Sequence, residues 1–168
     1  THTMAISRAG IRKLVPKNLR LVSGPGCPVC VTDQAYIDKA IAYARYKDVI
    51  ITTFGDMMRV PGTHSTLEKE KAVGANINVV YSPWDTLKVC TDNPDKKVVF
   101  LAVGFETTAP ATAVTVLDAE KSGLSNFHII CAHKTVPQAL DALCSDPQLK
   151  VNGFLCPGHV SVIIGGNA

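Results

Sequence analysis

The sequence predicts an α/β fold in which β-loop-α units repeat along a parallel sheet. Short apolar segments without inside–outside alternation recur along the 168 residues, as is typical of parallel strands that are covered on both faces. Amphipathic segments with helix-start signals lie between them. Apolar residues make up 46% of the chain and charged residues 18%. This balance allows a sizeable hydrophobic core and excludes a disordered chain.

Six segments are predicted to be strands because they are short and rich in Val, Ile, Leu and Phe. In chain order they are residues 19–23, 49–53, 77–81, 98–103, 128–131 and 153–155.

Capping residues predict where the helices between these strands begin. Asp33 can cap a helix whose apolar residues recur with helical spacing from Ile37 to Ala44. Another helix is expected after Thr108, and Gly123 would end it. Three further starts carry capping-box pairs: Ser65 with Glu68, Ser82 with Asp85, and Thr135 with Gln138.

The chain is predicted to divide into two small α/β lobes that face a cleft. Polar and turn-forming residues interrupt the pattern at 91–97, with three predicted strands on each side. Residues 1–94 would form the first lobe and residues 95–168 the second. We expect the second lobe to be incomplete at its C-terminal end, because the apolar segment 160–164 has no partner downstream. A single six-stranded sheet is the alternative.

Composition and charge favour a cytoplasmic protein. The apolar runs are far shorter than the ~20 residues of a membrane-spanning helix, and no signal peptide opens the chain, so no membrane association is expected. The net charge of +3 is scattered without a basic block, so nucleic acid is not an expected partner. Of six cysteines only Cys27 and Cys30 lie close together, which favours a reducing compartment over a disulfide scaffold.

Chemically active side chains and glycines gather after the predicted strands. Because the carboxyl ends of parallel strands meet at one edge of a sheet, where such sheets bind ligands, we expect these residues to face one cleft. They are Gly24, Gly26, Cys27, Cys30, Asp56, Arg59, Glu106, Thr107, Thr108, His133, Cys156 and His159.

The C-x-x-C segment of Cys27 and Cys30 is the strongest single motif. Thiols at this spacing can form a disulfide, or one or both can bind a soft metal. Gly24 and Gly26 let the backbone approach a ligand closely. A zinc site is disfavoured because no second C-x-x-C is present. Two small buried side chains in a tight loop are the alternative interpretation.

The other cysteines and the carboxylate are less specific signals. Cys90, Cys131 and Cys144 are predicted to pack in the core, whereas the position of Cys156 stays open. Glu106 stands alone in an uncharged segment, so it is a candidate metal ligand, proton acceptor or ion-pair partner of Arg59.

Four motifs together resemble the HypD family of [NiFe]-hydrogenase maturation proteins. They are GPGCPVC at 24–30, FGDMMRVPG at 54–62, GFETTAP at 104–110 and PGHVS at 157–161. The resemblance covers essentially the whole chain. It implies a scaffold that assembles the Fe(CN)2CO unit of the hydrogenase with a HypC-type small chaperone and a HypE-type cyanide donor protein.

The resemblance also implies a role for individual residues. Cys27 would hold the iron together with a cysteine of the chaperone, and Cys30 would take part in thiol redox changes. Thr1-His2-Thr3 resembles the end of a family Cys-Gly-x-His motif, so His2 would line the same cleft. The glutamate–threonine loop and the Pro-x-His-Val-Ser loop of the family correspond to Glu106, Thr107, Thr108 and His159. Family members carry a [4Fe–4S] cluster in a further domain, and its ligands are absent from this chain.

Two other functions stay open from the residues alone. A thiol oxidoreductase would use Cys27 and Cys30 as a dithiol, although no thioredoxin-like aromatic residue precedes the pair. A nucleotide- or phosphate-binding enzyme would use the glycine-containing loops, although neither the P-loop nor the dinucleotide-binding motif is present. The resemblance instead implies a metallocofactor-assembly scaffold with thiol redox function rather than a turnover enzyme.

Overall fold

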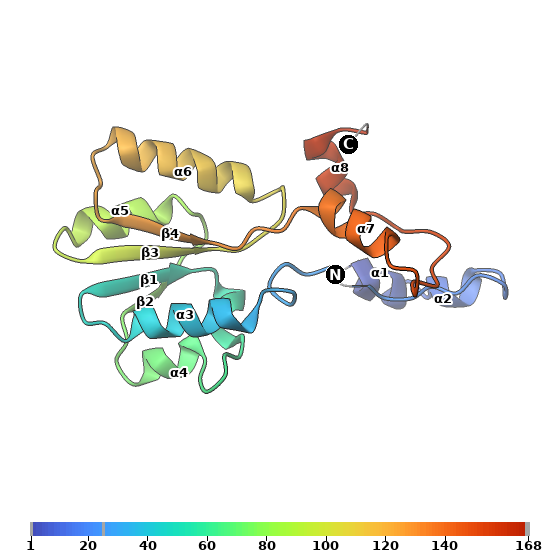
Figure 1. Ribbon diagram of the computed structural model, residues 1–168, viewed down its shortest axis with the longest axis horizontal. Helices are drawn as coiled ribbons and strands as arrows, with labels where there is room; N and C mark the ends of the chain where they lie inside the picture. Colours follow the sequence, from blue (N-terminus) through green and yellow to red (C-terminus); the bar gives the residue numbers. More distant parts are fainter. Residues whose placement is uncertain (1, 25, 167–168) are drawn as a thin grey trace.

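The computed structural model describes residues 2–24 and 26–166, and its centre is a parallel four-stranded sheet (Figure 1). The strands β1 (Val49–Thr53), β2 (Ile77–Val79), β3 (Lys97–Ala102) and β4 (Phe127–Cys131) lie in the order β2-β1-β3-β4. Ile51 of β1 is in register with Ile77 of β2 and Val99 of β3. The predicted α/β class and the parallel sheet are confirmed.

Helices cover both faces of this sheet. On one face lie α3 (Gln34–Ala44) and α4 (Leu67–Ala72), and on the other lie α5 (Asp85–Asp92) and α6 (Ala109–Lys121), as Figure 1 shows. Alternate residues of β3 point to opposite faces. Val99 and Leu101 join the core beneath α3 and α4, whereas Val98 packs with Cys90 of α5. This three-layer arrangement explains why the central strands read as continuous apolar runs.

The capping signals predict most helix starts to within one or two residues of the observed starts. The Asp33 carboxylate accepts a hydrogen bond from the amide of Ala35 at 2.9 Å and caps α3. Thr66, rather than the predicted Ser65, caps α4 by accepting from the amide of Lys69. Before α5, the Asp85 carboxylate accepts from the amide of Ser82 at 2.9 Å.

Helices α6 and α7 (Val136–Cys144) begin directly after Thr108 and Thr135, but neither residue makes a side-chain cap. Helix α6 ends before Gly123, whose φ of 66° lies in the left-handed region that glycine adopts readily. Between β1 and α4, the 3₁₀ helix η1 (Gly55–Arg59) follows the carboxyl end of β1.

Two predicted strands are wrong. Residues 19–23 and 153–155 have no regular secondary structure, and Val22 and Leu155 are 69% and 81% exposed. A short apolar run fixes neither a pairing partner nor burial, so it cannot be distinguished from an extended loop by composition alone. The final apolar segment forms the helix α8 (Gly158–Ile164).

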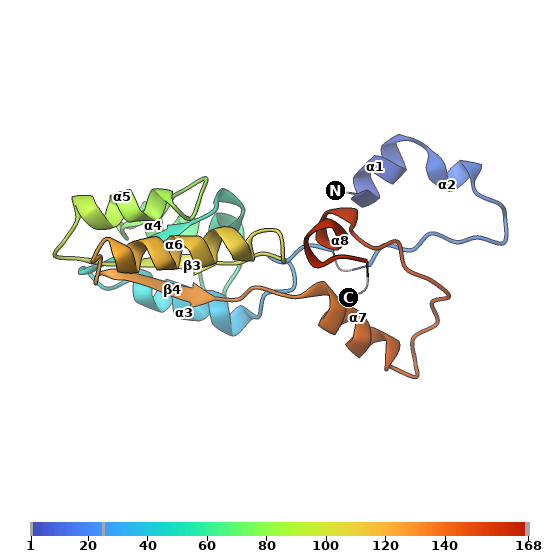
Figure 2. The same ribbon diagram turned by 90° about the horizontal axis from the view of Figure 1, so that it is seen from above.

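Four helices lie beyond the carboxyl ends of the strands. In Figures 1 and 2, α1 (His2–Arg8), α2 (Ile11–Leu14), α7 and α8 gather at this end, joined to the sheet by extended segments. Neither α2 nor α7 has a buried residue. Helices α2 and α7 therefore add no buried side chain to the core, whereas α8 buries Val160.

The predicted boundary at residues 94 and 95 falls within one sheet. Strands β1 and β3 come from its two sides and pair along their length. The Asn126 amide also donates to the carbonyls of Asn93 and Lys96, at 3.0 and 3.1 Å, and holds the intervening turn against the sheet. Two lobes facing a cleft are therefore not seen in the described part of the chain, and the division into residues 1–94 and 95–168 stays a prediction.

Within the described ranges, no helix has both the length and the apolar character needed to cross a membrane.

Candidate functional site

The C-x-x-C loop is a hydrogen-bonded turn that leads into α3. The Cys27 sulfur accepts a hydrogen bond from the backbone amide of Cys30 at 3.3 Å. The Thr32 hydroxyl donates to the carbonyl of Pro28 at 2.8 Å, and Val29 packs against the core. Both cysteines are free thiols, Cys27 half-buried and Cys30 exposed. The turn therefore presents both sulfurs at the surface while its apolar residue anchors it.

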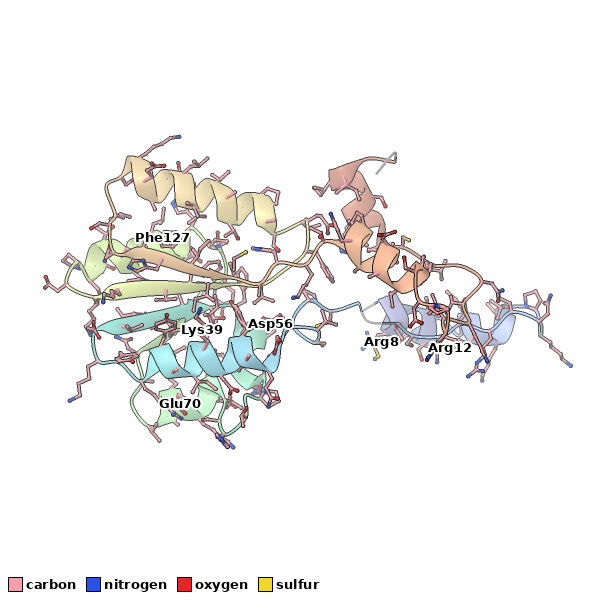
Figure 3. All side chains as sticks on the ribbon, in the orientation of Figure 1. Arg8, Arg12, Lys39, Asp56, Glu70 and Phe127 are labelled. Carbon is pink, nitrogen blue, oxygen red and sulfur yellow. The ribbon has the colours of Figure 1, made fainter. Side chains whose placement is uncertain are left out.

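The two thiols are chemically unequal. Hydrogen bonding with Cys27 raises the pKa of the Cys30 thiol above its ordinary value of 9.0, and the negative charge of nearby Asp56 adds to this effect. Cys30 therefore stays protonated at neutral pH. Figure 3 shows Asp56 at the end of the sheet where α3 begins, so η1 lies near the C-x-x-C loop.

Arg59 does not pair with Glu106, which corrects one of the sequence-based alternatives. Its Nε lies 3.4 Å from Oε1 of Glu68, and both side chains are largely exposed. The ion pair joins η1 to α4, two elements that follow each other in the chain. The Glu106 carboxylate has a different partner.

Glu106 is a buried carboxylate that ties the β3–α6 turn to α7. It is 9% exposed, and its Oε1 accepts a hydrogen bond from the backbone amide of Val136 at 2.6 Å. Among the described residues, its buried Oε2 has no hydrogen-bond partner. One carboxylate oxygen is thus occupied in positioning the start of α7, and the other is available to a donor beyond those of the described residues.

The same turn requires a glycine at position 104. A Cβ there would overlap Oγ1 of Thr108 and lie 2.8 Å from its Cβ and 3.3 Å from Cδ2 of His133. The Gly104 carbonyl accepts from the amide of Lys134 at 2.9 Å, and the Thr108 hydroxyl donates to the carbonyl of Phe105. Thr107 is exposed in this turn. The loops that follow β3 and β4 are therefore packed directly on each other.

Tyr36 joins the start of α3 to the end of β4. Its hydroxyl donates to the carbonyl of Ile130 at 2.7 Å, and burial raises its pKa, with the nearby thiol of Cys131 adding to the effect. Beside it, the Cys131 sulfur lies 3.3 Å from Nδ1 of His133. The sequence analysis placed His133 at this edge but assigned Cys131 to the core, so it did not predict the contact between them, although residues two apart on a strand share one side.

Two of the cysteine predictions are wrong. Cys131 is exposed because β4 is an edge strand, and Cys144 is exposed because α7 lies beyond the sheet. The prediction for Cys90 is confirmed, since it is fully buried. Cys156, left open before, is exposed.

The remaining predicted residues lie apart from these contacts or outside the description. Gly24 and Gly26 are exposed, and a Cβ on either would meet no atom within 4 Å. His159 is exposed near the start of α8. The side chain of His2 is outside the described residues. In the ranges that the structure describes, no group of three or more His, Cys, Asp or Glu side chains is placed to hold a metal ion.

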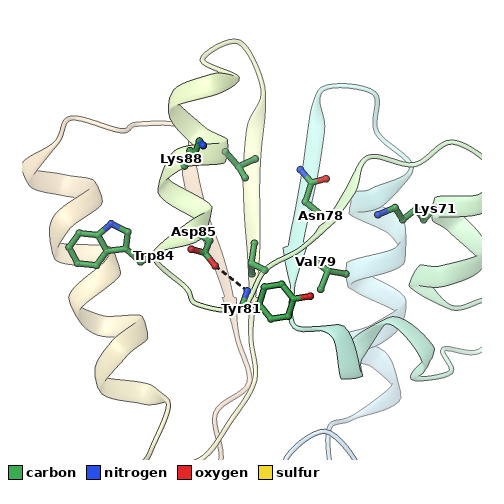
Figure 4. A pocket seen from close by; sticks show the side chains of 9 residues that line it. Lys71, Asn78, Val79, Tyr81, Trp84, Asp85 and Lys88 are labelled. Carbon is green, nitrogen blue, oxygen red and sulfur yellow. Dashed lines mark hydrogen bonds between the residues drawn. The ribbon is translucent and has the colours of Figure 1, made fainter.

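A separate hollow borders the edge strand β2 (Figure 4). Its lining contains no cysteine or histidine and includes Lys71, Val79, Tyr81 and Lys88. The Asp85 carboxylate accepts from the amide of Tyr81 at 3.1 Å, the dashed line in Figure 4. Without a thiol, this hollow is not part of the candidate site.

Comparison with known proteins relates the whole chain to one family. A family model named HypD, with the description "Hydrogenase formation hypA family", matches residues 1–168. The hydrogenase maturation factor HypD of Rhodobacter capsulatus is 48% identical over 164 residues, which are 98% of this chain. The corresponding factor of Escherichia coli K12 is 46% identical over 167 residues, or 99% of this chain. The chain covers 44% and 45% of these two proteins, so it spans less than half of their length.

Proposed function

The chain belongs to the HypD family, and from this premise we propose that it serves in hydrogenase maturation as a scaffold that holds the Fe(CN)2CO unit. The iron unit is the cargo, and the Cys27 thiolate is its anchor. A HypC-type small chaperone would supply a second sulfur, and a HypE-type protein would donate cyanide. The longer relatives bear the names of maturation factors, and the activity of the whole protein is part of this proposal.

The geometry of the C-x-x-C loop is the observation that carries the proposal. Cys27 is half-buried and receives an amide hydrogen bond from Cys30. Such a bond stabilises a thiolate and tunes its donation to a metal. A thiolate is a suitable soft ligand for iron that also carries cyanide and carbonyl ligands. Cys27 would be the one ligand from this loop, so the remaining coordination positions would fall to the diatomic ligands and to the sulfur of the partner.

The other family-motif residues are proposed to line the same site. The unpartnered Oε2 of Glu106 would accept a hydrogen bond from a partner or a proton during a ligand transfer. Asp56 lies close enough to influence Cys30. The family motif alone assigns the remaining residues to the site: His2, Gly24, Gly26, Arg59, Thr107, Thr108 and His159.

A thiol oxidoreductase is the second candidate, favoured by the contact between Cys27 and Cys30. Within the scaffold, the same contact would keep the Cys30 thiol beside Cys27 when the iron unit leaves. The two candidates differ in whether Cys27 acts without Cys30, because a dithiol needs both sulfurs while an iron ligand needs only Cys27.

Complementation of a bacterial strain that lacks its own HypD tests the proposal in the full-length protein. Cys27→Ala is expected to abolish hydrogenase activity, whereas Cys144→Ala, which changes an exposed cysteine on α7, is expected to retain it. Equal abundance of both variants on an immunoblot serves as the folding control. Full activity of Cys27→Ala would contradict the proposal.

A further inference from the structure

Cys131 and His133 form a thiol–imidazole pair outside the C-x-x-C loop. The Cys131 sulfur lies 3.3 Å from Nδ1 of His133. The two residues are the last of β4 and the second residue after it, so the strand geometry directs both side chains to one side. Cys131 is exposed, and a small molecule in solvent can therefore reach its sulfur.

The imidazole is held in place by its surroundings. Its Cδ2 lies only 3.3 Å from the position that a Cβ on Gly104 would take, so the ring packs against the backbone of the β3–α6 turn. Partial burial of the ring lowers the pKa of His133, and the imidazole is therefore neutral at pH 7. In the tautomer with its proton on Nε2, Nδ1 accepts a hydrogen bond from the neighbouring thiol.

The neighbouring Tyr36 hydroxyl does not compete with the imidazole for the Cys131 thiol. The Tyr36 hydroxyl, which approaches from α3, is occupied with the carbonyl of Ile130 at 2.7 Å. Of the described cysteines, Cys30, Cys144 and Cys156 are also exposed. Among the hydrogen bonds of the described residues, Cys131 has one to a histidine ring, whereas Cys144, the exposed cysteine of α7, has none.

We propose that Cys131 is a nucleophilic thiol, activated by His133, that forms mixed disulfides with small disulfides of the glutathione class. The thiol proton moves to Nδ1 of His133, and the sulfur attacks one sulfur of the small disulfide. Its S–S bond breaks as the new S–S bond forms, and the departing thiolate takes the proton from the imidazolium. Cys131 is oxidised and half of the small disulfide is reduced, so electrons and protons balance.

The test compares two exposed cysteines of the same protein. The reduced full-length protein is exposed to glutathione disulfide without oxygen, quenched in acid and digested, and the modified fraction of each cysteine-containing peptide is followed by mass spectrometry. Imidazole catalysis predicts modification of Cys131 at least about tenfold faster than of Cys144. Equal rates at the two positions would overturn the proposal, and this comparison needs no variant.

A histidine variant then assigns the cause. His133→Gln is expected to slow modification of Cys131 to the rate of Cys144 and to leave the rate at Cys144 unchanged. A Cys131 rate that stays fast in this variant would remove His133 from the role. The peptide with Cys27 and Cys30 is measured in the same digest, so the result for Cys131 is separate from the test of the iron-unit proposal.

Discussion

At the residue scale, the candidate site depends on side chains that connect loops far apart in the sequence. Glu106 accepts from the amide of Val136, thirty residues later, and Tyr36 donates to the carbonyl of Ile130. The pairing of Cys27 with Cys30 and the Asp33 cap follow from local spacing and were predictable. The hydrogen bond from the amide of Val136 to Glu106 was not predictable, because nothing in the sequence around Val136 indicates that a distant carboxylate is its partner.

Removal of the Glu106 carboxylate tests this connection. Glu106→Ala leaves the amide of Val136 without its acceptor and is expected to lower the free energy of unfolding by about 1–3 kcal/mol. Glu106→Gln keeps an acceptor oxygen and is expected to lose less. Urea denaturation measures both, with Glu120→Gln on the exposed face of α6 as the control. Equal stability of Glu106→Ala and the wild type would contradict the assigned role.

At the element scale, the predictions succeeded where a pattern is long or bounded and failed where it is short. Helix α3 has its cap and its apolar spacing in the sequence, and both are confirmed. Residues 19–23 and 153–155 have only apolar character, and strand formation also needs an edge to pair with. Exposure of Cys131 and Cys144 depends on the places of β4 and α7 in the fold, which no local pattern reveals.

An ion pair between α3 and α4 predicts a pH-dependent stability. The Arg45 guanidinium donates two hydrogen bonds to the Glu70 carboxylate, at 2.8 and 3.0 Å, and lowers the pKa of Glu70 from 4.5 to about 2. The folded state therefore gains stability from Glu70 above about pH 4.5, and this gain is lost as the pH falls towards 2. Thermal unfolding between about pH 7 and pH 2 measures the loss.

The Arg45→Gln variant assigns that loss to the ion pair. It is expected to be less stable at neutral pH, because Glu70 stays buried without its partner, and to show a smaller decline in acid. Arg59→Gln is the matched control, since the Arg59–Glu68 pair is exposed and such pairs contribute about 0–1 kcal/mol. Parallel pH profiles for Arg45→Gln and the wild type would exclude the assigned contribution.

The turn after β3 gives a second prediction at this scale. Gly104→Ala forces its Cβ against Thr108 and the ring of His133, and overpacking of this kind typically costs about 1–3 kcal/mol. We expect a lower denaturation midpoint than for Gly153→Ala, where the added Cβ meets no atom within 4 Å. Similar midpoints for the two variants would show that the turn adjusts without cost.

At the scale of the whole molecule, the sequence indicated the class but not the arrangement. The strand order β2-β1-β3-β4 could not be derived from the sequence pattern, and the predicted boundary near residue 94 lies inside a sheet that spans it. Of the four helices beyond the carboxyl ends of the strands, the sequence predicted α7. It did not predict that these helices lie apart from the sheet. The chain spans less than half of the length of its relatives. Tests of function therefore use the full-length protein.

The infrared spectrum of the complex is the most direct test of the claim that Cys27 holds the iron unit. Full-length protein, co-produced with a HypC-type chaperone and purified without oxygen, is expected to show cyanide and carbonyl stretching bands together with bound iron. Cys27→Ala should lose both the bands and the iron while still co-purifying with the chaperone, and Cys144→Ala should keep them. The same bands and the same iron content in Cys27→Ala would contradict the account.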